Sequence, residues 1–181
     1  MSGVIKVDTI QKPNGSAPTL ANLSINHTGS IIQTVFAAGS SSSQGFGSDT
    51  QYSAAAYTDI DSSTLSITPS SSSSKILILA TNHIYVPAIS NNAWRGANIK
   101  ILRDSTVISD ENGGYGEMHY TQDDNDRYMT YSSRQIIDSP NTTSAITYKC
   151  QISSKIDTMI LYCNKLNYGS GGHFMAMEIA G

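Results

Sequence analysis

Two aromatic segments carry the side chains best suited to contact another molecule. The first is Trp94-Arg95 and the second is Tyr115-Gly116-Glu117-Met118-His119-Tyr120. Aromatic faces stack on sugar rings, and Arg, Glu and His exchange hydrogen bonds with hydroxyl groups. The glycines predict a loop that holds such groups at an exposed tip. The alternative is that the aromatic rings pack in the core or at a subunit contact. The candidate contact residues are Trp94, Arg95, Tyr115, Glu117, His119 and Tyr120.

Catalytic motifs are missing from the sequence. It contains no HExxH, no GxSxG and no phosphate-binding GKS or GKT. Asp110, Glu111 and Glu117 are the best candidates for a pair of glycosidase carboxylates. Carboxylates close to Gly113-Gly114 are more typical of a solvated loop. The sequence therefore predicts a protein that is not an enzyme and has no cofactor.

Metal-binding spacings are also missing. The four histidines are widely scattered, at His27, His83, His119 and His173. Asp123-Asp124-Asn125-Asp126 offers oxygen ligands for calcium but lacks the distal Glu of a complete calcium loop, so an exposed acidic turn is favoured. We predict no metal site in the single chain. A site built from several copies of the chain stays open.

Composition excludes several classes of partner. The chain has 181 residues, of which 14% are charged, and a net charge of -3, so no cationic field is available for nucleic acid or anionic lipid. Its longest aliphatic run, Ile76 to Ala80, is far shorter than the roughly 20 residues of a membrane-spanning helix. The opening Met1 to Lys6 lacks the pattern of a secretory signal. Cys150 and Cys163 are expected to be buried free thiols, with a disulfide as the alternative.

The residue pattern that must position these groups is typical of β-strands. In Ala145 to Ser153, apolar and polar residues alternate, as expected for a half-buried strand. Helical periodicity is missing, apart from one candidate turn near Ser53 to Tyr57. The sequence predicts an all-β fold, an antiparallel β-sandwich or jelly roll. The other predicted strands are 30–37, 65–68, 75–86, 97–102, 106–109, 128–137, 158–166 and 174–179.

Two polar segments are predicted to connect strands. Arg103-Asp104-Ser105 reads as a short hairpin loop, because Asp and Ser can bond their own backbone in a turn. Ser139 to Thr143 separates two further strands, and Pro140 cannot continue a ladder of hydrogen bonds.

The N-terminal segment differs from the rest and is predicted to be an extended arm, residues 1–28, ahead of a knob domain, residues 29–181. Prolines at positions 13 and 18 interrupt regular structure. Its aliphatic residues have few neighbours of their own, so a surface on another chain is the expected place for them. A disordered tail is the alternative. The candidate attachment residues are Val4, Ile5, Val7 and Ile10.

The order of several short segments resembles tail-fibre-like and other structural proteins of marine bacteriophages. The similar segments span the chain from Gly3-Val4-Ile5-Lys6-Val7-Asp8-Thr9-Ile10-Gln11 and Thr28-Gly29-Ser30-Ile31-Ile32-Gln33 to Met177-Glu178-Ile179-Ala180-Gly181. Between them lie Ser66 to Pro69, Ser73 to Ile78, Arg95 to Arg103 and Asp138 to Tyr148.

The resemblance implies a virion protein that is assembled in the host cytoplasm. Its N-terminal arm would dock on other virion proteins, and its β domain would form a homotrimer that projects as a fibre or knob and contacts carbohydrate or protein on the host surface. No heptad shaft or β-helix repeat is present, which keeps open a capsid decoration or head-fibre protein without a decisive receptor role. A carbohydrate-binding or carbohydrate-active protein is the remaining alternative. Neither nucleic-acid binding nor membrane insertion is expected.

Overall fold

The computed structural model describes residues 28–37, 51–52, 56–86, 93–110, 117–121, 127–154, 161–164 and 172–181. Every regular element in these ranges is a β-strand, and every strand pair is antiparallel. This confirms the antiparallel β-sandwich predicted from the sequence. In the same ranges, no helix meets the length and hydropathy required to cross a membrane.

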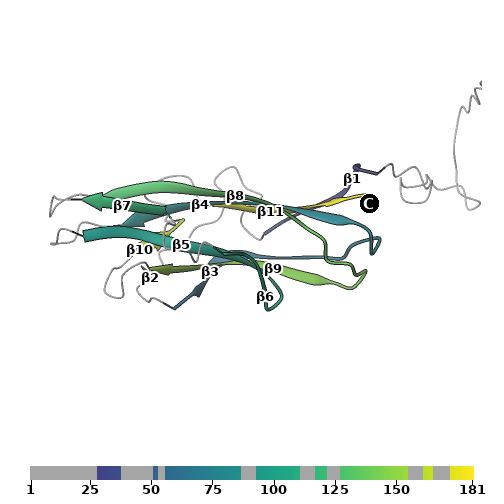
Figure 1. Ribbon diagram of the computed structural model, residues 1–181, viewed down its shortest axis with the longest axis horizontal. Coiled ribbons are helices and arrows are strands. Elements are labelled where there is room, and N and C mark those ends of the chain that lie inside the picture. Colours follow the sequence, from purple (N-terminus) through teal and green to yellow (C-terminus); the bar gives the residue numbers. More distant parts are fainter. Residues whose placement is uncertain are drawn as a thin grey trace, which may run out of the picture.

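The described strands form two sheets, which lie as two layers in Figure 1. In the six-stranded sheet, the order is β1-β11-β4-β10-β2, and β8 pairs with the opposite edge of β4. Its strands are β1 (Ile31–Phe36), β2 (Gln51–Tyr52), β4 (Lys75–Val86), β8 (Tyr128–Asp138), β10 (Leu161–Cys163) and β11 (His173–Ile179). The five-stranded sheet has the order β3-β9-β5-β6, with β7 also paired to β5. Its strands are β3 (Thr58–Ile67), β5 (Ala93–Arg103), β6 (Thr106–Asp110), β7 (Glu117–Thr121) and β9 (Ile146–Ser154).

The core lies between the two layers. Alternate residues of each long strand point inward, because side chains of a strand project to opposite faces in turn. Burying one such Ile or Phe contributes about 1.5–3 kcal/mol to the free energy of unfolding. The largest fully buried apolar side chains are Ile76, Ile78, Ile84, Ile99, Ile101, Tyr148, Ile152, Leu161 and Phe174.

The predicted hairpin between β5 and β6 is present. Asp104 adopts a left-handed backbone conformation with φ 52°, which Asp tolerates better than most residues. Its carboxylate Oδ1 accepts a hydrogen bond from the Thr147 amide at 3.0 Å, and its own amide donates to the Thr147 carbonyl at 2.7 Å. The hairpin is thereby fastened to β9. By contrast, the segment around Pro140 joins strands of different sheets, since β8 and β9 lie in opposite layers.

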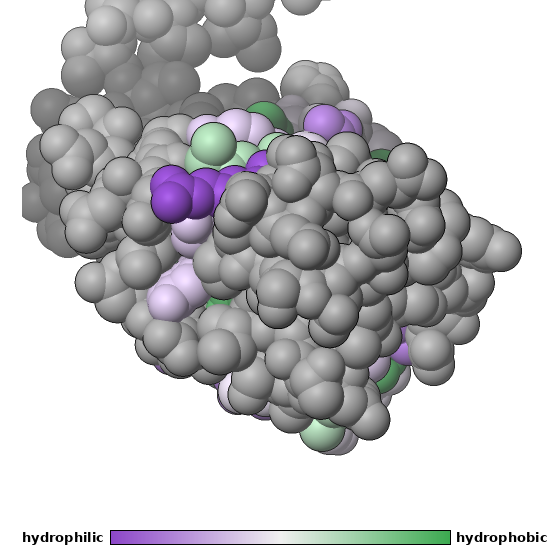
Figure 2. Space-filling view, turned by 90° about the vertical axis from the view of Figure 1, so that its left-hand side faces the viewer, coloured by the Kyte–Doolittle hydropathy of each residue, from purple (hydrophilic) through white to green (hydrophobic). Residues whose placement is uncertain are grey.

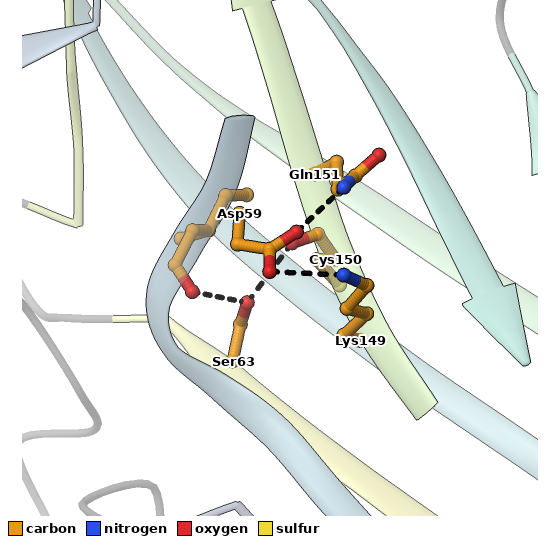
Figure 3. A network of polar contacts seen from close by, with 6 residues as sticks. Asp59, Ser63, Lys149, Cys150 and Gln151 are labelled. Carbon is orange, nitrogen blue, oxygen red and sulfur yellow. Dashed lines mark hydrogen bonds and ion pairs between the residues drawn. The ribbon is translucent and has the colours of Figure 1, made fainter. Parts of the chain in front are cut away.

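The start of β3 was not predicted from the sequence. The predicted strand began at Leu65, whereas β3 begins at Thr58 and changes register between Asp59 and Thr64. At this irregularity the Ser63 side chain turns inward and donates a hydrogen bond to the Ile60 carbonyl at 2.6 Å (Figure 3). The bulge breaks the alternation of polar and apolar residues on which the prediction depended. The candidate helical turn near Ser53 to Tyr57 lies mostly outside the described residues, and its described part, residues 56–57, leads directly into β3.

Asp138 joins the two sheets near one end of the sandwich. It closes β8, and its carboxylate accepts hydrogen bonds from Nη1 of Arg103, at 2.9 Å to each oxygen. The hydroxyl of Tyr148 donates to the same carboxylate at 2.6 Å. Arg103 and Tyr148 are cross-strand partners in the opposite sheet. One carboxylate of the six-stranded sheet therefore holds two neighbouring strands of the five-stranded sheet, and we call these three residues the Asp138 clasp.

Glu178 is another carboxylate at the same end, and it is fully buried. Its Oε2 accepts a hydrogen bond from the Gln33 side chain at 2.6 Å, and its Oε1 accepts hydrogen bonds from the amide and the hydroxyl of Ser70, both at 2.7 Å. Gln33 also donates to the Thr68 carbonyl at 2.7 Å. The carboxylate therefore ties β1 and β11 to the segment that links β3 with β4.

Candidate functional site

The predicted contact residues come from two strands that the fold places side by side. Trp94 and Arg95 lie in β5, and Glu117, His119 and Tyr120 lie in β7. The antiparallel register pairs Trp94 with Tyr120, and Arg95 with His119. The prediction of a loop tip is wrong for these residues, because a ladder of backbone hydrogen bonds fixes both segments. Tyr115 lies outside the described residues.

These paired strands lie at one end of the sandwich, and the described chain begins at the other. Thr28-Gly29-Ser30 meets the C-terminus, where the Gly29 amide donates to the Ala180 carbonyl at 2.8 Å and the Ala180 amide donates to the Ser30 carbonyl at 2.8 Å. Gly29 has φ +89°, a conformation that favours glycine. We call this end the entry pole. In Figure 1 it lies on the right, beside β1 and the label C, whereas β7 lies on the left.

The strand registers give the same separation of the ends. Lys75, the first residue of β4, pairs with Ile179 at the entry pole. The clasp between Asp138 and Arg103 places the last residue of β5 at this pole too. Because β5 is 11 residues long, its first residues lie about 30 Å away, at what we call the contact pole. Figure 2 views the molecule from this end, and the coloured residues along its upper edge include hydrophobic and strongly hydrophilic ones that adjoin.

The candidate attachment residues Val4, Ile5, Val7 and Ile10 lie outside the described part of the chain. The segment that contains them is covalently joined to the domain at the entry pole. The described chain therefore enters the domain at the end opposite the predicted contact strands.

The histidines for which side chains are described do not form a metal centre. His83 is buried, and burial lowers the pKa of its imidazole, so the ring is neutral near pH 7. Its ring lies 4.9 Å from that of its cross-strand partner Tyr131. His173 is exposed at the start of β11. Within the described ranges, no group of three or more His, Cys, Asp or Glu residues is arranged to hold a metal ion. His27 and Asp123 to Asp126 lie outside these ranges.

Asp110, one of the candidate carboxylates, belongs to a polar cluster on the five-stranded sheet. Its Oδ1 accepts a hydrogen bond from the Tyr57 hydroxyl at 3.0 Å. The ammonium of Lys100 lies 3.8 Å from the centre of the Tyr57 ring, a cation–π contact. Burial, followed by the bond to Asp110, raises the pKa of Tyr57. These contacts link Tyr57, the residue before β3, to Lys100 of β5 and Asp110 of β6, which lie beyond β9 in the same sheet. Glu111 lies outside the described residues, and the side chain of Glu117 is not described.

A second polar cluster lies on the outer face of the five-stranded sheet (Figure 3). The Asp59 carboxylate accepts hydrogen bonds from Lys149 at 2.9 Å and from Gln151 at 2.6 Å. Burial alone would raise the pKa of Asp59, but the bonds from Gln151 and Lys149 outweigh it and lower the pKa. The side chain of Asp59 is 53% exposed, so this ion pair contributes about 0–1 kcal/mol to stability.

The two cysteines are free and buried, as predicted. Burial raises the pKa of Cys150 to about 12 and the pKa of Cys163 well above its ordinary value. Both thiols therefore stay protonated at neutral pH and act as small apolar core residues.

One surface was not predicted from the sequence, the outer face of the six-stranded sheet. Its signal was the run from Ile76 to Ala80, in which no polar residue alternates with the aliphatic ones. Such a run is typical of a strand that is covered on both faces. Exposed apolar side chains of neighbouring strands lie on this outer face, among them Phe36 and Ile137.

No protein-family model matches the chain, and no curated protein matches it. The functional proposal therefore rests on the residues of this chain and on their placement.

Proposed function

We propose that this chain is a structural protein of a bacteriophage particle, in which residues 1–28 attach to other virion proteins and the β domain projects outward as a homotrimeric fibre or knob. The contact pole then faces the host surface. The observation that carries the proposal is the separation of the two poles, because an appendage needs attachment at one end and contact at the other. The order of the segments that resemble marine-phage structural proteins also supports it.

The arm provides the first test. Replacing Val4, Ile5, Val7 and Ile10 with serine removes the apolar groups that we expect to bury against the particle. We expect the purified variant to keep the thermal stability of the wild type and to be lost from assembled particles. Incorporation is measured by the amount of the protein in purified virions. Deletion of residues 1–26 should have the same effect, because the first strand begins only at Ile31.

A matched control uses an aliphatic residue of the folded domain. Val107 is 43% exposed in β6, and Val107→Ser should leave incorporation unchanged. Normal incorporation of the arm variant would contradict the attachment role.

The contact pole provides a separate test. Alanine at Trp94 and at Tyr120 should weaken adsorption of the purified protein to host cells, because each removes a stacking surface worth about 1 kcal/mol. Three linked sites on one trimer multiply the loss of apparent affinity. We expect thermal stability to stay unchanged.

The same two variants distinguish contact from packing. A loss of roughly 3–5 kcal/mol of stability in the alanine variants would assign these aromatics to packing instead. Adsorption and stability that both match the wild type would favour the capsid decoration or head-fibre function. Val107→Ala, in the hairpin at the entry pole, is the control and should change neither measurement.

A further inference from the structure

The outer face of the six-stranded sheet is apolar across four neighbouring strands. In β4, the even-numbered residues Ile76 and Ile78 belong to the core, so the odd-numbered residues of that strand point outward. Strand pairing then aligns Leu77 with Ile137 of β8 and with Met177 of β11, and aligns Met175 with Leu79 and Phe36. We call the following six residues the apolar face: Phe36, Leu77, Leu79, Ile137, Met175 and Met177.

The members of the apolar face are accessible to differing degrees. Ile137 is 62% exposed and Phe36 is 48% exposed. Leu77, Leu79, Met175 and Met177 lie between them and are half-buried. Their outward-pointing neighbours Thr34, Thr81 and Gln135 carry no charge, whereas Lys75, at the start of β4, is charged and exposed. The six residues therefore form a continuous uncharged surface with Lys75 at its margin.

The outer face of the other sheet provides an internal comparison. There the outward positions of β9 are Thr147, Lys149 and Gln151, and those of β3 include Thr64 and Ser66. This alternation of inward apolar and outward polar residues is the usual pattern of an antiparallel sheet with one face in water. Only the six-stranded sheet departs from it, among the described strands. Contact with water therefore explains the polar outer face of the five-stranded sheet but not the apolar outer face of the six-stranded sheet.

The size of the apolar face suits a contact between proteins. Four strands about 4.8 Å apart, each contributing about seven residues at about 3.4 Å, cover roughly 450 Å² in projection, which is the outer face around and including the six apolar residues. Protruding side chains make the accessible area larger than the projection, and each partner contributes about 800 Å² to a standard interface, so such a contact would use the whole outer face of these strands, Thr34, Thr81 and Gln135 included. Methionine and aromatic residues are also enriched in the centres of such interfaces, and charged residues are depleted there.

We propose that copies of this chain pack against one another through the apolar face. Every other copy supplies the same six uncharged residues, so packing them together buries no unpaired charge among them. A sugar would require polar groups that the face lacks, and an anionic lipid surface would require cations. Because the strands run from one pole to the other, packing through this face leaves both poles accessible. The number of three copies rests on the proposed function, whereas the choice of face rests on its composition and size.

The test places a positive charge on the apolar face of the full-length protein. Ile137→Lys and Gln135→Lys each introduce an ammonium on exposed positions of β8, where a monomer tolerates it and a packed interface does not. We expect light scattering to give 3 × 19.4 kDa, about 58 kDa, for the wild type and 19.4 kDa for both variants, a threefold fall. Val107→Lys places the same charge on an exposed aliphatic position of the other sheet and should leave the mass at that of the wild type.

Circular dichroism and thermal melting verify that each variant is folded. Should Ile137→Lys fail to fold, Gln135→Lys decides, because glutamine at that position is already polar. A folded variant that keeps the wild-type mass, or a wild type that is monomeric at micromolar concentration, would overturn the choice of face. If incorporation depends on the arm but both lysine variants keep the wild-type mass, the choice of the apolar face is overturned and the attachment role is not. Dissociation of both variants together with arm-independent incorporation would overturn only the attachment role.

Discussion

Replacing Asp138 with alanine should lower the free energy of unfolding by about 3 kcal/mol, because it removes the shared acceptor of the clasp between the two sheets. The Tyr148 hydroxyl is fully buried and would lose its partner. Arg103 is 25% exposed at its side chain, so water would compensate part of its loss. Burial, followed by the bond to Asp138, raises the pKa of Tyr148, so the phenol keeps its proton and remains a donor. Urea unfolding of both proteins at neutral pH measures the difference.

Two further variants separate the clasp from a general effect of losing a carboxylate. Tyr148→Phe removes one hydrogen bond but leaves Asp138 paired with Arg103, and should cost about 1 kcal/mol. Asp59→Ala removes a carboxylate that also has two partners but lies on the solvent side, and should cost less than about 1 kcal/mol. Equal losses for Asp138→Ala and Asp59→Ala would show that burial between the sheets adds nothing to the contribution of Asp138.

The clasp also illustrates what the sequence could and could not predict. The strand 75–86 was predicted with the bounds that β4 has, and Ala145 to Ser153 differs from β9 by one residue at each end. Both segments contain enough Ile, Leu or Tyr for periodicity to be read locally. Asp138, in contrast, meets partners 35 and 10 residues away in another layer. Such contacts depend on how the sheets pack, which local periodicity does not encode.

The candidate contact residues were chosen by their aromatic and polar types, and their role stays a prediction. The fold pairs the two segments that contain them as β5 and β7. The strand β7 was not predicted, because Glu117 to Thr121 contains no aliphatic residue apart from Met118 and follows a glycine-rich stretch. The pairing of Trp94 with Tyr120 is likewise a long-range register that neither segment specifies alone.

The apolar face was missed for a different reason. The run from Ile76 to Ala80 was compared only with the length of a membrane helix, for which it is too short. The same run also predicts a strand covered on both faces, and this second consequence points to the interface that we propose.

Acid should destabilise the protein partly through Glu178, and Glu178→Gln should remove that part. Burial alone would raise the pKa of Glu178, but the hydrogen bonds from Gln33 and Ser70 outweigh it and lower the pKa below its ordinary value of 4.5. A carboxylate with a lowered pKa in the folded state stabilises the protein fully above its pKa in the unfolded chain. That contribution is lost as the pH falls from about 4.5 through the lower pKa of the folded state.

The amide of Glu178→Gln has the shape of the carboxylate but neither its charge nor its second acceptor oxygen. The amide nitrogen of the new side chain is a donor, and it must lie opposite either the Gln33 donor or the Ser70 donors. Two donors then face each other, so the variant should be about 2–3 kcal/mol less stable than the wild type at pH 7. This difference in the free energy of unfolding should become smaller as the pH falls below 4.5, because only the wild type loses an ionised group at this position.

Thermal or urea unfolding of both proteins between pH 7 and pH 3 tests this. The other carboxylates, Asp59 and Asp138 among them, are present in both proteins, so the difference between the two stability curves isolates Glu178. The oligomer mass must be measured at each pH, because dissociation would also lower the apparent stability. Parallel curves, with a gap that stays constant down to pH 3, would mean that the charge of Glu178 contributes no stability. A narrowing gap would mean that three neutral donors hold an ionised carboxylate inside the sandwich, where β1, β11 and the segment between β3 and β4 meet.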